Sequence, residues 1–227
     1  MAVTAVRGTP GGHGIGGILP ARGAQPIIMP LPQRSRFIPT LPASPANRVR
    51  IIGGAWRRRL IRFPPAEGLH PTPDRVRETL FNWLGQDLTG KRCLDLYAGS
   101  GALTLEAASR GAVLAVAVDR NRLLVDALRA TGTDLRAAAL ETCVADAKAF
   151  VANERRDFDV IFLDPPFRED PWTWLLPACA ERLAARGFIY AEAAHALLPP
   201  PGFAAWRRDR AGQVHYHLFT RTEAAPE

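Results

Sequence analysis

The stretch KRCLDLYAGSGALTLEAA, residues 91–108, predicts a strand, a tight turn and a helix in immediate succession. Gly99, Ser100 and Gly101 form the turn. Glycines at such a turn permit positive φ angles and let a ligand lie against bare backbone. The helix that follows directs its free N–H groups to the same place. These residues therefore predict a cradle for a small molecule at the end of a strand.

Asp95 and Thr104 decide between two ligand classes for this cradle. A dinucleotide fingerprint, G-x-G-x-x-G or G-x-G-x-x-A, needs a third small residue that packs helix against strand, but Thr104 stands there. The carboxylate of Asp95 would repel a diphosphate, whereas it would attract an ammonium or a sulfonium group. The pattern D-x-x-x-G-x-G resembles motif I of class I methyltransferases, which bind S-adenosylmethionine. A tight turn without a ligand is the alternative interpretation.

Composition and charge limit the class of protein. The chain has 227 residues, 47% of them hydrophobic, which suits one sizeable α/β domain with appendages. No apolar run has the length of a membrane span, and three cysteines without C-x-x-C spacing indicate reduced thiols in a cytoplasmic protein. Ten arginines and no acidic residue precede Glu67, whereas the whole chain has a net charge of +7. This segregation favours a polyanionic partner such as a nucleic acid; solubility and an arginine-favouring genome are the alternative explanation.

Four segments are expected along the chain. Residues 1–47 are rich in proline and glycine and have no period, which predicts a disordered tail. Residues 48–72 form a basic arm, in which two short strands are expected to meet at a Gly53-Gly54 turn. Residues 73–222 form the domain that binds the methyl donor, and residues 223–227 form a short tail. Prolines in the first segment oppose a secretory signal, and Met29 offers an alternative start.

Helices and strands are expected to alternate after the basic arm. The segment TPDRVRETLFNWL has an apolar helical face and is expected to be capped by Thr72 or Asp74. Strands are expected at 113–118, 140–144, 158–163 and 188–191, with helices at 121–131, from 147 and at 172–186. Residues 203–208 and 214–220 are expected to pair as a hairpin. The pattern predicts a mostly parallel, seven-stranded, Rossmann-like sheet with helices on both faces and a C-terminal antiparallel hairpin, as class I methyltransferases have.

Acidic residues follow or end four consecutive strands of this predicted sheet, at Asp95, Asp119, Asp146 and Asp164. Each alone is explained as a turn or cap residue, but the carboxyl ends of parallel strands meet at one edge, where ligands bind. For S-adenosylmethionine, Asp119 is placed to accept both ribose hydroxyls, and Asp146 to accept from the adenine amino group. Asp95 is expected near the methionine end.

The tetrapeptide Asp164-Pro165-Pro166-Phe167 resembles the (D/N)-P-P-(F/Y) motif of enzymes that methylate the exocyclic amino group of a base or an amide nitrogen. An aryl amine is a poor nucleophile because its lone pair is delocalised into the ring. The Asp164 carboxylate and the Pro165 carbonyl together accept both N–H hydrogens and turn the lone pair towards the methyl group. Phe167 offers a face on which a base stacks, for about 1–3 kcal/mol. A proline-stiffened loop with a core phenylalanine is the alternative interpretation.

Five segments together resemble the bacterial 16S rRNA guanine-N2 methyltransferases of the RsmD type: IIGGAW, GLHPTPDRVRETLFNWL, CLDLYAGSGAL, FLDPPF and AGQVHYHLF. The resemblance runs from about residue 48 to residue 221. It implies a monomer that transfers a methyl group from S-adenosylmethionine to N2 of a guanine in 16S rRNA, within the small ribosomal subunit or an assembly intermediate. Such a base is reachable because it lies in a loop and can be splayed out.

Residues of three roles follow from the motifs and this resemblance. The predicted catalytic residues are Asp164, Pro165 and Phe167. The predicted cofactor site comprises Asp95, Tyr97, Gly99, Ser100, Gly101, Asp119, Arg120, Asp146 and Ala147. RNA contacts are predicted for Arg50, Trp56, Arg57, Arg58, Arg59, His70 and Arg75. No metal is predicted, because His215 and His217 have no third ligand nearby in sequence.

Two departures from the family pattern concern the RNA side. His70 stands where the family usually has arginine, so a titratable group replaces a permanent charge. The run from Trp56 to Leu60 lacks the family's second-position glycine and is a residue shorter. Two other functions stay open: methylation of an amino group on DNA or another RNA, and a non-catalytic role as an rRNA-binding assembly factor. Glu192 follows a buried strand, and the sequence leaves open whether it belongs to the site or to the surface.

Overall fold

The computed structural model describes residues 47–224, all within the compact unit Leu41–Glu227. The predicted tail of residues 1–47 lies outside the described residues except for Asn47, and residues 225–227 of the predicted C-terminal tail lie outside them too. None of the helices that the structure describes combines the length and the apolar character of a membrane-spanning segment.

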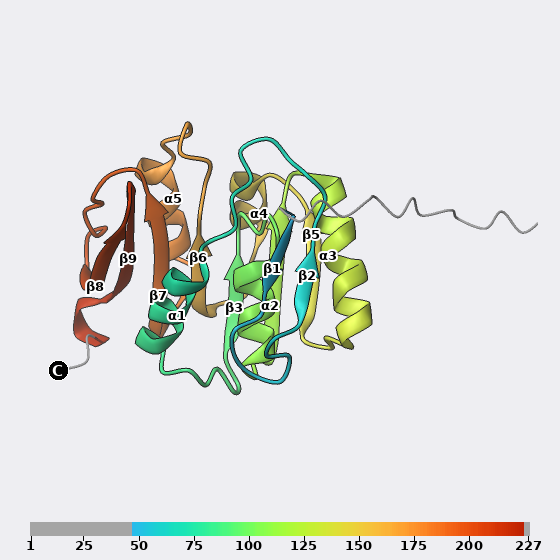
Figure 1. The fold of residues 1–227 in the computed structure, drawn as a ribbon. Helices are drawn as coiled ribbons and strands as arrows, with labels where there is room; N and C mark the ends of the chain where they lie inside the picture. Colours follow the sequence, from blue (N-terminus) through green and yellow to red (C-terminus); the bar gives the residue numbers. More distant parts are fainter. Residues whose placement is uncertain (1–46, 225–227) are drawn as a thin grey trace, which may run out of the picture. The chain divides into compact units, whose positions relative to one another are not determined.

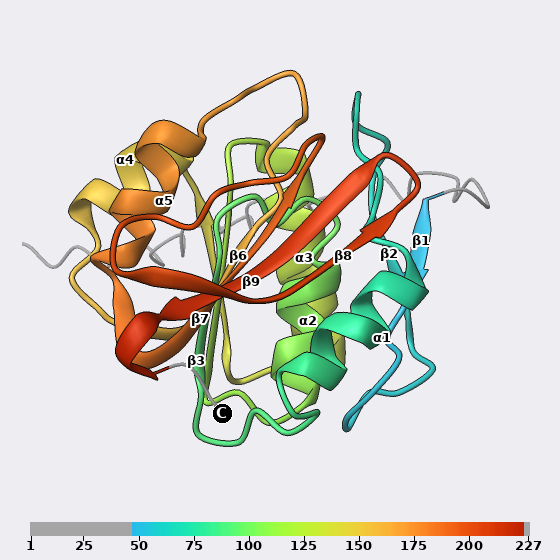
Figure 2. The same ribbon diagram turned by 90° about the vertical axis from the view of Figure 1, so that its left-hand side faces the viewer.

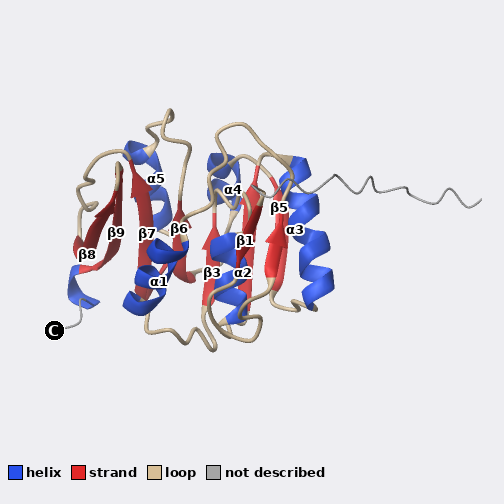
Figure 3. Ribbon diagram, viewed as in Figure 1, coloured by secondary structure: helices blue, strands red, loops and turns tan. Residues whose placement is uncertain are grey.

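A seven-stranded sheet forms the centre of the fold, in the order β5-β4-β3-β6-β7-β9-β8 (Figure 1, Figure 3). Its strands are β3 (Arg92–Asp95), β4 (Leu114–Asp119), β5 (Leu140–Val144), β6 (Phe158–Leu163), β7 (Leu183–Ala193), β8 (Phe203–Ala211) and β9 (Val214–Arg221). The strands from β5 to β7 are parallel, whereas β9 runs antiparallel to both of its neighbours. The predicted sheet and its closing hairpin are confirmed. The strand order reverses at β3, which is where ligands of open α/β sheets bind.

Helices cover both faces of the sheet (Figure 2). One face carries α1 (Asp74–Trp83), α2 (Ala102–Ser109) and α3 (Arg122–Leu135), and the other carries α4 (Ala147–Asn153) and α5 (Trp172–Ala180). Successive residues of one strand serve the two layers: Ile161 of β6 packs with Leu175 of α5, whereas Phe162 packs with Phe81 of α1. A short 3-10 helix, Thr222–Ala224, follows β9. Burial of both faces fixes the carboxyl ends of the strands at one edge.

A two-stranded antiparallel ribbon, β1 (Arg48–Arg50) and β2 (Leu60–Arg62), packs against α2 and α3. Val49 pairs with Ile61, and both side chains are buried, whereas the arginines of the ribbon face solvent. The two predicted short strands are therefore present. The ribbon joins the same core as α2, and the division of the chain at residue 72 stays a prediction.

The predicted Gly53-Gly54 turn between these strands is wrong, because the whole segment 51–59 separates them. Hydrogen bonds between Ile51 and residues 58–59 close this longer loop, and α2 holds it as well: the Ala55 N–H donates to the Ser109 carbonyl at 2.7 Å. Gly54 has a φ of 71°, and a Cβ there would lie 1.9 Å from the Ser109 carbonyl oxygen. Glycine is required at position 54 for two reasons: the chain passes close to the end of α2, and its backbone has a positive φ.

Two further expectations about helix ends are corrected. Neither Thr72 nor Asp74 caps α1, since Pro73 is the N-cap residue and no side chain caps the helix. The Thr72 hydroxyl donates to Glu192 instead, at 2.9 Å. The helix predicted at 172–186 ends at Ala180, and the strand predicted at 188–191 begins at Leu183. Leu183 pairs with Phe158 of β6, and a register irregularity follows, so strand pairing overrides the helical pattern.

Candidate active site

A cavity of about 580 Å³ opens at the carboxyl edge of the sheet, where the strand order reverses. Asp95 at the end of β3, Asp119 at the end of β4, Asp146 after β5 and Asp164 after β6 all line it. The four acids that the sequence places at one edge are thus brought together. Every predicted catalytic and cofactor residue except Gly101 lines this cavity.

The glycine turn joins β3 to α2 and forms one wall of the cavity. Gly99 and Gly101 have φ angles of 51° and 77°, so both adopt the left-handed conformation that favours glycine. The Gly99 N–H donates to the Asp119 carboxylate at 2.8 Å. Gly101 faces away from the cavity, and a Cβ there would lie 2.4 Å from a methyl group of Leu128 on α3. Gly101 therefore brings two helices together, whereas Gly99 borders the ligand space.

Asp119 and Asp146 each accept hydrogen bonds from backbone N–H groups and also line the cavity. The second carboxylate oxygen of Asp119 accepts from the Asn121 N–H at 2.8 Å, so this side chain bridges the glycine turn and the start of α3. One Asp146 oxygen accepts from the Ala149 N–H at 3.0 Å and caps α4. A carboxylate accepts about four hydrogen bonds. Both side chains therefore keep acceptor capacity for a ligand.

Asp95 is buried at the floor of the cavity, with 2% of its surface exposed. It accepts a hydrogen bond from the Thr104 hydroxyl at 2.7 Å. Burial raises the pKa of Asp95 to about 7; the Thr104 hydrogen bond opposes this shift, and the nearby Asp119 charge adds to it. Thr104 stands where a dinucleotide fingerprint has its small residue, and its hydroxyl donates the hydrogen bond to the Asp95 carboxyl group. The sequence shows Thr104 as a departure from the dinucleotide fingerprint, but no local pattern identifies it as the partner of Asp95.

The raised pKa of Asp95 predicts a pH-dependent stability. The folded protein holds this proton up to about pH 7, whereas the unfolded chain releases it near 3.8. The stability from this carboxyl is therefore fully present below pH 3.8 and is lost as the pH rises through 7. Asp95→Asn has no carboxyl group to titrate at this position. The unfolding free energy of the wild type should therefore fall relative to that of the variant by about 2–3 kcal/mol between about pH 5 and pH 8.

Urea unfolding of the wild type and Asp95→Asn at the two pH values measures this shift. Asp170→Asn is the matched control, because Asp170 is exposed in the loop before α5. A difference between wild type and Asp95→Asn that does not change with pH would show that Asp95 titrates as it does in the unfolded chain.

The tetrapeptide of residues 164–167 forms the wall next to β6. Asp164 is half-buried, and its pKa is raised well above its usual range, first by burial and then by the charges of Glu192 and Asp95. Pro165 is buried, whereas Phe167 exposes 50% of its surface. The alternative of a core phenylalanine is thus not what the structure shows. Phe167 lines the cavity and leaves half of its surface open to solvent.

A strap of residues 66–72 also lines the cavity, and only His70 of the strap was predicted from the sequence as a site residue. Leu69 packs over the glycine turn, because a Cβ on Gly99 would lie 2.7 Å from its methyl group. Thr72 is buried and is bonded at both ends: its hydroxyl donates to Glu192, and its carbonyl accepts from Arg77 Nε at 3.0 Å. These contacts cannot be predicted from a local sequence pattern, because they join distant parts of the chain.

The predicted RNA-contacting residues fall into two groups. His70 lines the cavity, and Arg75 is exposed on α1. The second group, Trp56, Arg57, Arg58 and Arg59, belongs to the segment 51–59, which is bonded to Ser109 at the carboxyl end of α2. Arg50 adjoins this second group, because it pairs with Leu60 next to Arg59, and it also forms an ion pair with Asp74 at 3.1 Å. The cavity lies at the opposite end of α2, about 12 Å away along its axis. The structure therefore does not bring the two groups together.

Glu192 lies at the end of β7 with 4% of its surface exposed. The structure thus excludes the surface position that the sequence left open. Burial raises the pKa of Glu192, although the hydroxyls of Thr72 and Tyr190, each donating at 2.9 Å, oppose the shift.

The paired histidines of β9 are part of the packing. His215 and His217 have ring centroids 6.5 Å apart, and His217 Nε2 accepts from the Leu197 N–H at 3.2 Å. Burial lowers the pKa of His217. Within residues 47–224, no three His, Cys, Asp or Glu side chains come together in a way that could hold a metal ion.

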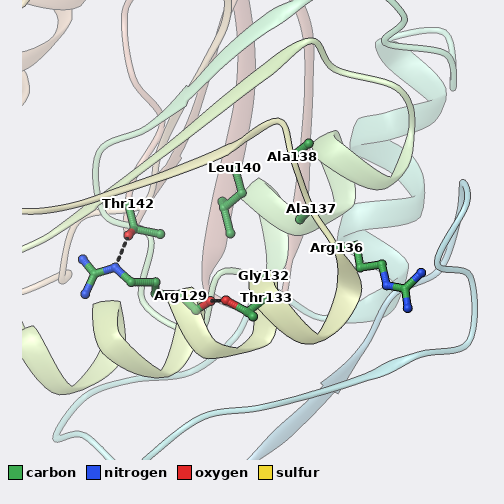
Figure 4. Close-up of a pocket in the computed structure, with 8 residues that line it drawn as sticks. All are labelled: Arg129, Gly132, Thr133, Arg136, Ala137, Ala138, Leu140 and Thr142. Carbon is green, nitrogen blue, oxygen red and sulfur yellow. Dashed lines mark hydrogen bonds between the residues drawn. The ribbon is translucent and has the colours of Figure 1, made fainter.

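A second hollow, of about 380 Å³, lies between the end of α3 and the edge strand β5 (Figure 4). Its lining includes Arg129, which donates to the Thr142 hydroxyl at 3.1 Å. Arg136 points away from the hollow (Figure 4). The lining contains no acid and no nucleophilic cysteine, so the chemistry-bearing residues gather in the larger cavity.

Comparison with known proteins identifies the family. A family model described as Conserved hypothetical protein 95 matches residues 49–220. The sequence is 38% identical over 183 residues to the Ribosomal RNA small subunit methyltransferase D of Escherichia coli strain K12, covering 78% of this chain and 92% of that protein. The chain belongs to this methyltransferase family. The Haemophilus influenzae protein of the same name is 34% identical over 181 residues, covering 76% of this chain and 94% of that protein.

Solved structures agree with membership of the methyltransferase D family. The putative methyltransferase yhhF from Escherichia coli superposes with a TM-score of 0.70 at 38% identity, covering 77% of this chain and 98% of that chain. The putative methylase HI0767 from Haemophilus influenzae superposes with a TM-score of 0.66 at 31% identity, with the same coverage of 77% and 98%. The matched residues of this methyltransferase run from β1 into β9, so the ribbon and the cavity both belong to the shared part.

Proposed function

We propose that this chain transfers the methyl group of S-adenosylmethionine to the exocyclic N2 of a guanine in the 16S rRNA of the small ribosomal subunit. The observation that supports it most is that the tetrapeptide 164–167 and the glycine turn line one cavity, in a chain 38% identical to an rRNA small subunit methyltransferase D. Methylation of an amino group on DNA or another RNA would suit the same cavity. The names of the relatives favour rRNA.

The charges of the cavity fit a cationic methyl donor. Six acids line it, Glu67, Asp95, Asp119, Asp146, Asp164 and Glu169, against the cationic side chains Arg120 and Arg168 and the titratable His70. Arg120 is itself paired with Glu169 at 2.9 Å. S-adenosylmethionine, when bound, supplies an activated methyl group on a sulfonium. Asp119 would hold its ribose hydroxyls, Asp146 and Ala147 its adenine, and Asp95 its methionine end.

The tetrapeptide would hold the target amine. The Pro166 carbonyl already accepts from the Glu169 N–H at 2.8 Å, whereas no backbone N–H of the described residues donates to the Pro165 carbonyl. The Pro165 carbonyl and the Asp164 carboxylate are therefore the two acceptors for the N–H hydrogens of the amine. Phe167 would stack on the base, worth about 1–3 kcal/mol. Orientation of the nitrogen supplies most of the rate.

Asp164 would also take the proton that the amine loses. Methylation makes the amine nitrogen cationic and acidic, and an efficient general base has a pKa near the working pH. Burial beside two other acids raises the pKa of Asp164 in that direction.

RNA contacts would follow the ribbon. Arg48 and Arg62 are directly opposite each other and both exposed, and like charges so placed are destabilising unless an anion lies between them. Arg62 precedes the strap, whereas Arg57, Arg58 and Arg59 lie at the far end of the ribbon. No acidic residue occurs in residues 48–62. A phosphate chain that runs along the ribbon towards the cavity would meet both groups.

Neutralising Arg57, Arg58 and Arg59 together should flatten the salt dependence of RNA affinity. Each lost phosphate contact lowers the slope of log affinity against log salt by about 0.7 for single-stranded RNA. Binding titrations at several salt concentrations measure it, with Arg48 and Arg62 neutralised in a second variant. Arg155, exposed after α4 on the other face of the sheet, is the matched control. An unchanged slope would remove the segment 51–59 from the RNA interface.

The function itself is tested with labelled methyl donor. The purified chain is incubated with naked 16S rRNA and with small subunits from a strain that lacks it, and the label is located by nucleoside digestion and mass spectrometry. N2-methylguanosine in 16S rRNA is the expected product. A label on adenine, on DNA or on no nucleic acid would contradict the proposal.

A further inference from the structure

Glu192 and Asp164 are placed side by side by the register of the sheet. Leu163, the last residue of β6, pairs with Ala191 of the parallel strand β7; Asp164 directly follows β6, and Glu192 is the next residue of β7. Neighbouring strands lie about 4.8 Å apart, and in-register residues point to the same face. Two positions earlier, Phe162 and Tyr190 have ring centroids 6.4 Å apart, which shows that their side chains share a face. Glu192 thus faces the same side of the sheet as Asp164.

The hydrogen bonds of Glu192 leave one of its oxygens for a ligand. Both protein donors, the hydroxyls of Thr72 and Tyr190, bond to Oε1 at 2.9 Å. Within the described part of the chain, the one fully enclosed side-chain nitrogen or oxygen without a partner is Nδ1 of His217. Oε2 of Glu192 receives no bond from residues 47–224 and is not among the fully enclosed atoms, so part of its surface is accessible. Glu192 is not itself among the residues that line the cavity, but its hydrogen-bond partner Thr72 and its neighbour Asp164 are.

Two carboxylates in this arrangement match the edge of one base. Guanine carries its N2 amino group next to a ring N1–H, so the adjacent positions are both donors. Adenine has an acceptor nitrogen at N1, beside its N6 amino group. An ionised carboxylate only accepts hydrogen bonds. When Glu192 is ionised beside the Asp164 carboxylate, it therefore pairs with guanine N1–H and leaves two acceptors opposed when adenine enters; a protonated Glu192 would lose this selectivity.

We propose that Glu192 selects guanine by accepting its N1–H through Oε2, next to the N2 amino group that Asp164 holds. This role rests on the proposed function and names the residue that sets its base specificity. Thr72 and Tyr190 fix the carboxyl group through Oε1, so that its other oxygen keeps one direction. The guanine donors offset the repulsion between the two acids. A site built to bond an N–H group discriminates strongly against bases that lack it, because its acceptor is then left unpaired.

The test is a change of base preference in Glu192→Gln. The carboxamide oxygen still accepts from Thr72 and Tyr190, while the amide N–H₂ takes the place of Oε2. The substrates are small-subunit rRNA fragments with guanine or 2-aminopurine at the target position. The second base keeps the 2-amino group but has an unprotonated N1. We expect guanine methylation, as kcat/KM, to fall about 100-fold or more. The ratio of 2-aminopurine to guanine should rise at least about tenfold.

The matched control is Tyr190→Phe, which removes a donor to Oε1 and leaves Oε2 unchanged. It should lower kcat/KM on both substrates and keep their ratio. Calorimetric binding of S-adenosylmethionine and the far-UV spectrum check that Glu192→Gln is folded. A wild-type ratio of the two substrates in Glu192→Gln would overturn the specificity role while leaving the proposed function intact. Wild-type protein that methylates neither fragment nor any small-subunit guanine would overturn the proposed function and this role with it.

Discussion

Replacement of Asp164 by alanine is expected to reduce methyl transfer to small-subunit rRNA by about a thousand-fold or more while donor binding persists. The alanine side chain can neither accept the amine hydrogen nor take its proton, so the Pro165 carbonyl is left as the sole acceptor. Asp164→Asn keeps one acceptor oxygen but not the base. It should therefore fall between the wild type and Asp164→Ala. Transfer of labelled methyl groups, measured as kcat and KM separately, gives these values.

The fold of Asp164→Ala is not expected to suffer. Asp164 is half-buried and receives no hydrogen bond from residues 47–224, and the repulsion from Glu192 and Asp95 disappears with it. Binding of S-adenosylmethionine by calorimetry checks the cavity directly. Asp170→Ala, an exposed acid in the same loop, is the matched control and should keep full activity. Full activity in Asp164→Ala would refute the role assigned to this carboxylate.

The four acids at the carboxyl edge of the sheet could be predicted from the sequence, because their convergence depends on the topology of the sheet and not on the packing of individual side chains. Parallel strands joined by helices place all their carboxyl ends at one edge. Once Asp95, Asp119, Asp146 and Asp164 are read at strand ends, their convergence follows, and the cavity contains all four. Two predicted strands, at 140–144 and 158–163, have the bounds that the structure gives to β5 and β6. The mostly apolar run of β6 is flanked by Asp157 and Asp164, which mark both of its ends in the sequence.

The contacts of the strap with Glu192 could not be predicted, because they are long-range. Thr72 lies before a helix and has the chemistry of a cap, yet its hydroxyl bonds Glu192, 120 positions later. The local pattern predicts that Thr72 bonds the backbone of the helix that follows it, whereas in the tertiary fold its hydroxyl bonds Glu192 instead. Glu192 was ambiguous for the same reason, since its donors come from the strap and from its own strand.

The segment 51–59 shows the same limit on the RNA side. Its arginines are typical of a nucleic-acid arm, and the sequence predicts that they contact the RNA. In the structure, Ser109 and Glu106 hold this segment by its backbone at the carboxyl end of α2, the end away from the cavity. Charge predicts the partner class, whereas the position of an arm depends on which helix end it packs against.

Replacement of Glu106 by alanine is expected to be the most destabilising of the substitutions considered, at about 3–5 kcal/mol. The side chain is fully buried on α2 and lies between two arginines. Its Oε1 accepts from Arg110 Nε at 2.9 Å, and its Oε2 accepts from Arg77 Nη1 at 3.3 Å and from the Ile52 N–H at 2.9 Å. Alanine would leave the nearly buried Arg110 without an anionic partner among the described residues and the fully buried Arg77 with Asp74 as its remaining one.

Urea unfolding of Glu106→Ala measures this loss, and Glu78→Ala on the exposed side of α1 is the matched control, expected to change stability by less than about 0.5 kcal/mol. Because Ile52 loses its acceptor, the segment 51–59 should also become a protease site before the sheet unfolds. Arg77 donates to the Thr72 carbonyl as well, so the same variant loosens one support of the strap. A loss below about 1 kcal/mol would mean that water reaches both arginines once Glu106 is gone. The ribbon would then be held by the apolar contacts of Val49 and Ile61 and not by this buried charge.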